Sequence, residues 1–314
     1  MKLLAAIILV FATTGGDEAL VHSIPSKVSV LNYVQAENLR IYPLTYSGSS
    51  KTFMTLKTAL EKDLIVVKEK GDGDVNTVVI KNKSNSTIFV MAGEVIKGAK
   101  QDRMIENDLL IPPESKWIEV AVYCTEHGRW HGISKEFAAA DINVSPSVRA
   151  NARKEKSQSE VWAKVAENQQ DVMGGTSGTG AFAHIYDSKC YQDKRDTYYK
   201  KLKNLPSEYS SMKGVLVCVG DDIVCVDLFG SHTVLADLWP KLLDSYIVEA
   251  MRGLRKGSVS LSEAKKFIAE YRKVDLEDIY TPGIGDLYEI GSYDGQGSAL
   301  IYKGILVHTD LFPD

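Results

Sequence analysis

Two short segments of the chain concentrate the side chains that could carry out chemistry. The first is Gly93 to Arg103 (GEVIKGAKQDR) and the second is Cys124 to His131 (CTEHGRWH). Each follows an apolar run typical of a strand, and loops at strand ends are where rigid folds commonly display binding groups. We therefore expect the two segments to converge at one end of a sheet. Their candidate functional side chains are two carboxylates, an amide, two guanidinium groups and an indole ring: Glu94, Glu126, Gln101, Arg103, Arg129 and Trp130.

This set of side chains has two chemical interpretations. The two arginines, with Gln101 beside them, could bind a small anionic or phosphorylated ligand while Trp130 stacks on its ring. Glu94 or Glu126 would then be the catalytic general acid or base. Alternatively, each carboxylate pairs with the arginine of its own segment, and the pairs hold two irregular loops in place. The sequence leaves both interpretations open.

Other reactive groups give weaker patterns. His127 and His131 are four residues apart, but neighbouring glycines disfavour a helix and the H-E-x-x-H order is missing, so we expect no metal site. Asp227, Ser231 and His232 lie close together without the G-x-S-x-G context of a nucleophile elbow. We interpret Asp227 as an exposed strand-end residue.

The elements that must position these groups change character along the chain. Short β-rich runs separated by turns predict an antiparallel sandwich- or barrel-like half over residues 26–145. Longer amphipathic patterns predict a helical half over 146–257, with a β-hairpin at 214–229. A capped helix and further strands follow at 258–314. The predicted fold class is therefore α+β, and the glycine-rich segment 174–180 is expected to be a flexible connector.

A disulfide is possible in the predicted hairpin. Cys218 and Cys225 flank Gly220-Asp221-Asp222, and a two-residue loop at Asp221-Asp222 would place the cysteines opposite each other. Two buried thiols that pack as small apolar groups are an equal alternative.

The amino terminus and the overall charge bear on localisation and partners. The apolar run Leu3 to Ala12 follows a lysine and precedes small residues, which is typical of a bacterial secretory signal peptide ending near residue 16. This run is shorter than the roughly 20 residues of a membrane span. We expect an exported protein, periplasmic or secreted, with no stable membrane span after processing. A net charge of -4 gives no electrostatic basis for nucleic-acid binding.

The motifs of both loops resemble those of the ARG and Rhodanese-Phosphatase-superfamily-associated protein domain family. Gly93-Glu94, Gly98 and Gln101-x-Arg103 resemble the Gly-Glu, Gly and Gln-x-Arg motif of the family. Residues 124–130 resemble its Cys-x-Glu-x-Gly-Arg-Trp signature. Further likeness extends over a central helix and the second half, so that it covers roughly residues 28 to 252. The resemblance implies genomic association with ADP-ribosylglycohydrolases and with rhodanese or phosphatase proteins, and it carries no established catalytic residues.

The first functional expectation is an exported ligand-binding domain for a nucleotide-like or phosphorylated small molecule. One alternative is an enzyme that acts on an ADP-ribose-like or phosphorylated substrate through a Glu acid/base. Another is a structural or interaction protein of the cell envelope. An open pocket at the two loops would favour the first two possibilities, whereas paired and buried charges would favour a structural role. The sequence implies no particular cofactor.

Overall fold

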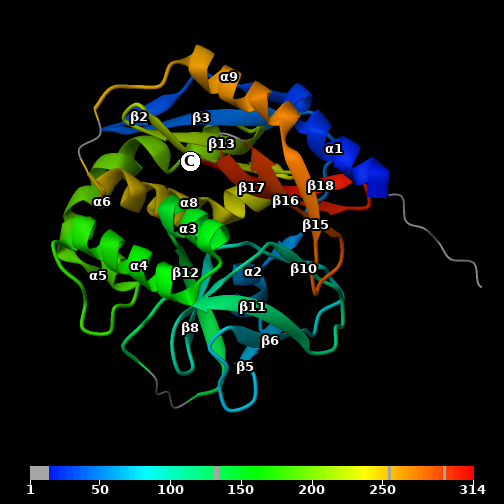
Figure 1. Cartoon of the computed structure of the whole chain (residues 1–314), viewed down its shortest axis with the longest axis vertical. Coiled ribbons are helices and arrows are strands. Elements are labelled where there is room, and N and C mark those ends of the chain that lie inside the picture. Colours follow the sequence, from blue (N-terminus) through cyan, green and yellow to red (C-terminus); the bar gives the residue numbers. More distant parts are fainter. Residues whose placement is uncertain (1–13, 130–133, 254–255, 293–294) are drawn as a thin grey trace, which may run out of the picture.

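A nine-stranded antiparallel sheet forms the larger body of the computed structural model, which describes residues 14–129, 134–253, 256–292 and 295–314 (Figure 1). In spatial order its strands are β1 (Val28–Val30), β3 (Leu39–Tyr46), β13 (Met212–Val219), β14 (Asp222–Phe229), β18 (Ile305–Pro313), β17 (Gly295–Tyr302), β16 (Asp286–Ser292) and β15 (Asp275–Ile279), with β2 (Val34–Ala36) paired to β3. The sheet therefore unites strands from both ends of the chain.

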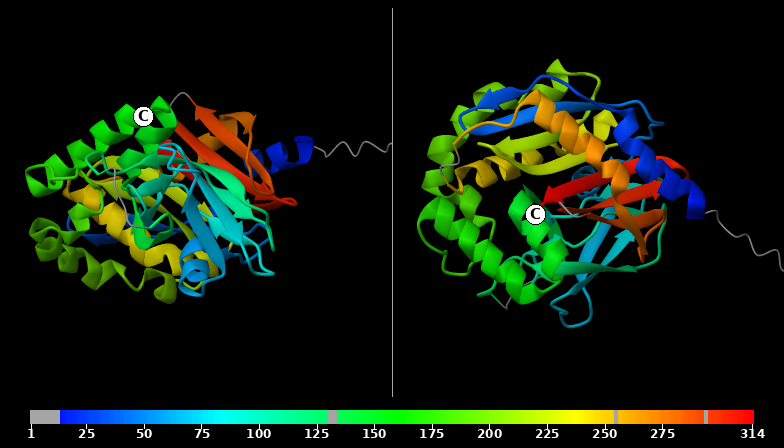
Figure 2. Two further views of the ribbon diagram at one scale, coloured as in Figure 1. Left: turned by 90° about the horizontal axis from the view of Figure 1, so that it is seen from below. Right: turned by 45° about the horizontal axis from the view of Figure 1, so that its top comes forward.

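Helices cover both faces of this sheet (Figure 2). One face packs against α3 (Pro146–Glu155), α4 (Gln158–Met173), α5 (His184–Asp187), α6 (Lys189–Leu202), α7 (Leu205–Glu208) and α8 (His232–Met251). The other face packs against α1 (Thr14–Lys27), α9 (Leu261–Glu270) and the 3-10 helix η1 (Tyr271–Lys273). Central strands are apolar on both sides because both faces are covered: Val215 and Val217 enter the first core, and Leu216 enters the second.

A second, smaller β body is built mainly from the N-terminal half. Its six-stranded sheet has the order β12 (Phe137–Asn143), β8 (Glu94–Gly98), β9 (Arg103–Ile105), β11 (Ile118–Cys124), β6 (Thr77–Asn82) and β5 (Ile65–Glu69). The sheet curls until its edge strand β5 meets the residues just before the other edge strand, β12. There the Glu69 N–H donates to the Lys135 carbonyl at 2.9 Å, and Lys68 forms a bridge with Glu136. Beside it lie β10 (Leu109–Ile111), β7 (Ile88–Val90), β4 (Met54–Thr55) and α2 (Leu56–Glu61). The predicted α+β class with a barrel-like N-terminal half is confirmed.

The β13–β14 hairpin corrects the expected disulfide. Val219 pairs with Asp222, so the turn falls one residue earlier than predicted. An irregularity after Val217 then places Val217 opposite Cys225 and Cys218 opposite a different residue. Cys218 and Cys225 are free thiols, and they pack into the cores on opposite faces of the sheet. Side chains on opposite faces of a strand pair point apart and cannot be bridged.

The amino terminus of the described chain belongs to the fold. Helix α1 begins at Thr14, and its Val21 and Ile24 are buried in the core beneath α9 and η1. The apolar run Leu3 to Ala12 and the start of the predicted signal peptide lie outside the described residues. None of the helices in the described ranges is both long and apolar enough to cross a membrane.

Candidate functional site

The loops that follow β8 and β11 lie against each other. The Gln101 amide donates from Nε2 to the Glu126 carbonyl at 2.7 Å, and the Asp102 N–H donates to Glu126 Oε2 at 3.1 Å. Arg129 donates from Nε to the same Oε2 at 2.9 Å and lies 3.1 Å from Asp102 Oδ1. A further bond runs from Arg129 Nη1 to the Ala99 carbonyl at 2.9 Å. The Arg129 guanidinium is therefore enclosed by two carboxylates and a backbone carbonyl.

Electrostatics within this cluster keep Glu126 ionised. Burial alone would raise the pKa of Glu126, but hydrogen bonds from Arg129 and from the Asp102 N–H outweigh it and lower the pKa below its usual value. The pKa of Asp102 is raised, first by burial and then by the nearby charge of Glu126. Arg129 thus holds together two carboxylates that would otherwise repel each other.

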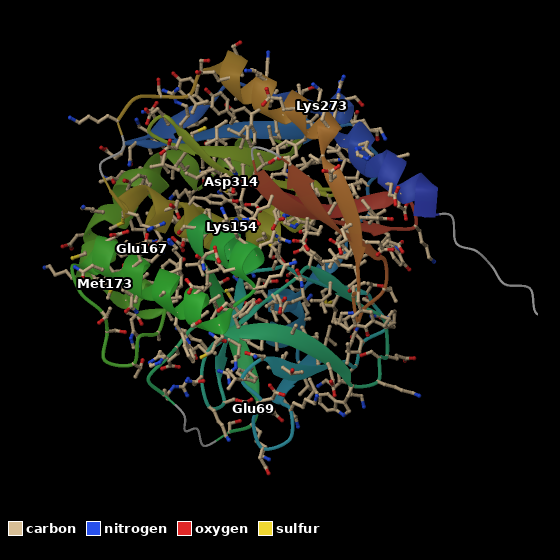
Figure 3. The ribbon with its side chains drawn as sticks, viewed as in Figure 1. Glu69, Lys154, Glu167, Met173, Lys273 and Asp314 are labelled. Atoms are coloured by element: carbon tan, nitrogen blue, oxygen red, sulfur yellow. The ribbon has the colours of Figure 1, made fainter. Side chains whose placement is uncertain are left out.

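Glu94 and Arg103 do not join the cluster around Arg129 through the contacts expected of a shared site. Glu94 is 2% exposed, forms an ion pair with Lys241 of α8 and accepts the Met91 N–H at 2.6 Å. Arg103 is fully buried, with Nη1 donating to Gln101 Oε1 at 3.3 Å and Nη2 lying 3.8 Å from Glu69 Oε1. Figure 3 shows Glu69 at the end of the barrel away from the large sheet. The suggested pair of Glu94 with Arg103 is therefore replaced by two separate pairings.

Helix α4 fixes the start of the second loop. Gln158 makes two hydrogen bonds with the backbone of Cys124: its Oε1 accepts the Cys124 N–H at 2.7 Å, and its Nε2 donates to the Cys124 carbonyl at 2.9 Å. The His127 ring packs edge-on against Trp162, with 4.5 Å between the ring centroids. Trp130, the expected stacking residue, lies outside the described residues.

The glycine-rich segment 174–180 packs against the same loop, which differs from the expected flexible connector. The Gly128 N–H donates to the Thr179 carbonyl at 2.7 Å, and a Cβ at Gly128 would lie only 3.1 Å from Thr179 Cα. On the other side, Gln169 accepts the Ser177 N–H at 3.0 Å. A side-chain amide on α4 thus supplies the anchor that composition alone does not reveal.

A second charged cluster, absent from the sequence predictions, lies inside the protein between the barrel and the large sheet. Arg149 donates to both carboxylate oxygens of Asp227, at 2.7 and 2.8 Å, and the Tyr246 hydroxyl donates to the same carboxylate at 2.5 Å. His308 joins Asp227 to Asp108, with Nε2 3.4 Å from Asp227 Oδ1 and Nδ1 2.6 Å from Asp108 Oδ2. Asp227 is 0% exposed, so its interpretation as an exposed strand-end residue was wrong.

The charges of this cluster stabilise one another. Burial opposes every charge, but Arg149 and His308 hold the pKa of Asp227 far below its usual value. Burial also opposes protonation of His308, yet Asp108 and Asp227 raise the pKa of His308 to about 10. The sequence signal is a carboxylate inside an otherwise apolar strand, Val224–Phe229, because a buried acid needs a partner.

The Ser/His/Asp constellation does not assemble, and His131 of the histidine pair lies outside the described residues. Ser231 Oγ lies 2.9 Å from Thr52 Oγ1, and His232 Nδ1 lies 2.6 Å from the Met212 carbonyl, so neither residue contacts Asp227. Within the described part of the chain, no group of three or more His, Cys, Asp or Glu side chains is arranged to hold a metal ion.

Comparison with known proteins identifies one family. The family model described as ARG and Rhodanese-Phosphatase-superfamily-associated Protein domain matches residues 27–312. The match spans the barrel, the large sheet and the C-terminal strands β15–β18, which extends the likeness well beyond residue 252. No curated protein and no solved structure matches the chain.

Proposed function

The chain belongs to this domain family, and from that premise we propose that it is a non-catalytic ligand-binding domain whose two charged loops serve as a structural clamp. The internal pairing of the two candidate catalytic carboxylates supports the non-catalytic, structural role of the loops, and a cavity of about 310 Å³ away from the loops supports the binding part. Glu126 is held by Arg129 and by the Asp102 N–H, and Glu94 is held by Lys241 and by a backbone N–H.

A general acid or base needs access to the substrate and a pKa suited to proton transfer near neutral pH. Glu126 is 4% exposed and its pKa is lowered by its partners, whereas Glu94 is 2% exposed beneath α8. Both carboxylates are thus buried and engaged by partners within the protein, and Glu126 is held in its charged form. The enzyme alternative therefore has less support than the binding alternative.

The same pairing disfavours an anion site at the loops. A phosphate that approached Arg129 would compete with Glu126 and Asp102 for its guanidinium group, and the carboxylates would lose part of their counter-charge inside the protein. The proposal therefore assigns ligand binding to a cavity away from the two loops.

The variant Arg129→Ala distinguishes a structural role of Arg129 from a role in ligand binding. As a clamp residue, Arg129 is expected to contribute about 3 kcal/mol to the free energy of unfolding, because its loss leaves two buried carboxylates facing each other. Arg272→Ala, at an exposed position of η1, is the matched control and should unfold like the wild type. Urea unfolding measures both variants.

Ligand binding is tested on the same proteins by a thermal-shift screen against sugars, nucleosides, nucleotides and phosphate esters, since bound ligand raises the melting temperature. The proposal expects at least one hit, an unchanged shift in Arg129→Ala and no turnover of the hit by mass spectrometry. No hit at all, turnover of the hit, or loss of the shift in an Arg129→Ala protein of normal stability would each overturn it.

Export completes the proposal and is supported by the Leu3 to Ala12 run. Processing near residue 16 would remove the apolar run and leave most of α1, whose Val21 and Ile24 are buried. Mass spectrometry of the natively expressed protein should find a mature chain that starts between Thr14 and Glu18. A cytosolic protein with Met1 intact would contradict export.

A further inference from the structure

A cavity of about 310 Å³ lies between the barrel and the outer strands of the large sheet. Strands β6, β10 and β11 supply one side, and the turn after β15 together with β16 supplies the other. Figure 1 shows β15 reaching toward the barrel beside β10 and β11. The volume is at the lower end of the range for small-molecule sites. The lining residues that matter for recognition are Thr77, Asn107, Glu119, Ala121, Tyr280 and Thr281.

The outer wall of the cavity is fixed to the barrel by close backbone contact. The Ile284 N–H donates to the Leu110 carbonyl at 2.9 Å, and the Gly283 N–H donates to Thr281 Oγ1 at 3.3 Å. A Cβ at Gly283 would lie 2.3 Å from the Leu110 carbonyl oxygen, so only glycine permits this approach. The wall is therefore held in place before any ligand arrives, and preorganisation lowers the cost of binding.

The cavity offers an aromatic surface and neutral polar groups. Tyr280 stands at its edge with 86% of its surface exposed, the highest value among the large exposed hydrophobic side chains of the described residues. The Thr77 hydroxyl and the Asn107 amide are half-buried, and in the described part of the chain neither makes a side-chain hydrogen bond. An aromatic face beside available donors and acceptors suits a ring that carries hydroxyl groups.

The charge of the lining disfavours anions. Its residues include no Lys or Arg, while Glu119 and Asp108 are acidic. Both Asp108 oxygens are already engaged, one by the Ala92 N–H and the other by His308. Glu119 pairs with Lys70 at 2.8 Å. A phosphate here would lose hydration without gaining a cationic partner from the lining, whereas an uncharged ligand avoids that penalty.

We infer that this cavity binds an uncharged hydroxylated ring, supplied by a free sugar or by the ribose of a nucleoside, with Tyr280 stacked on the ring or base. The inference rests on the proposed binding function and assigns its site and ligand class. Thr77, Asn107 and Thr281 donate or accept hydrogen bonds with the ligand hydroxyls, and Ala121 leaves room for the ring.

Ala121→Leu tests the site by filling it. Ala121 is exposed on β11 opposite Thr77, so a larger side chain occupies the cavity without entering a core. Ala138→Leu is the matched control, because Ala138 is an exposed alanine on β12 of the same barrel. Tyr280→Ala is the second test variant. Because the Tyr280 side chain is highly exposed, we expect this variant protein to fold like the wild type.

Isothermal titration calorimetry of the full chain with monosaccharides, nucleosides and their phosphate esters gives the readout. We expect Ala121→Leu and Tyr280→Ala to lower the affinity for the best uncharged ligand at least tenfold. The affinity of Ala138→Leu should stay within twofold of that of the wild type. Free sugars and nucleosides in separate arms distinguish the two sources. Tighter binding of a phosphate ester, or unchanged affinity in both cavity variants, would overturn the inference while leaving ligand binding intact. No binding by any compound class would overturn the proposed function itself.

Discussion

Asp108→Asn is the substitution that best probes the buried cluster. Asparagine keeps the size of the side chain and an oxygen for the Ala92 N–H, but it removes the negative charge 2.6 Å from His308 Nδ1. Asp108 is the largest favourable influence on the charge of His308. The variant should therefore lose both stability and pH dependence.

The magnitude follows from the pKa of His308. The folded protein raises that pKa from 6.5 to about 10, which corresponds to roughly 5 kcal/mol of stability. The folded state holds this proton more tightly than the unfolded state does. The stabilisation is therefore complete below about pH 6.5 and is lost as the pH rises through about 10. Asp227 supplies the smaller part of the shift, so we expect Asp108→Asn to cost about 3 kcal/mol at pH 6.5.

Urea unfolding of wild type and variant at half-unit steps from pH 6 to 10 tests this reasoning. The difference between the two proteins should be largest at pH 6 to 6.5 and should shrink toward pH 10, because His308 loses its charge in the wild type as well. Asp196→Asn, which removes an exposed carboxylate, controls for net charge and should give a constant difference near zero. A difference between Asp108→Asn and wild type that is near zero, or independent of pH, would refute the assignment of a charged His308.

Two further substitutions test local features. Lys241→Met should cost about 3 to 5 kcal/mol in urea unfolding, because it leaves the buried carboxylate of Glu94 without its partner; an unchanged midpoint would show that the ion pair does not stabilise the fold. Ser260→Ala should cost about 1 kcal/mol, because it removes half of the capping box that Ser260 forms with Glu263 at the start of α9. Ser260→Asp should retain most of that stability, and equal losses in both variants would argue against the cap.

Local sequence patterns were sufficient for element types and for the fold class. The capping box at Ser260 and Glu263 was readable because it involves neighbours three residues apart. Long-range pairing was not readable: β3 joins β13 in the centre of the large sheet, although the sequence groups β3 with the barrel half. Within the predicted helical half, α3 and α4 are divided at Lys156, which adopts a left-handed conformation, φ 46°, that no local pattern indicates.

The candidate site shows the same limit in chemical terms. The residue types identified the polar loops, but they did not predict which side chains form ion pairs with each other. Glu94 could pair with an arginine of its own segment, yet its partner is Lys241, 147 residues away on α8. Asp227 was misjudged for the same reason: a strand-end acid is exposed unless distant residues bury it, and here Arg149 and His308 do so.

Two buried ion pairs, Glu94 with Lys241 and Asp108 with His308, join the barrel to the larger body. Glu94 links β8 to α8 through Lys241, and Asp108 links the barrel to β18 through His308. Apolar contacts alone would tolerate a sliding of one body over the other, whereas buried paired charges are satisfied in only one alignment. Asn107 of the cavity is the neighbour of Asp108 in the chain, so that alignment also sets the distance between Asn107 and the Tyr280 wall. Under the proposed binding function, Glu94, which looks catalytic in the sequence, would serve the ligand indirectly by helping to hold the two walls of the cavity in register.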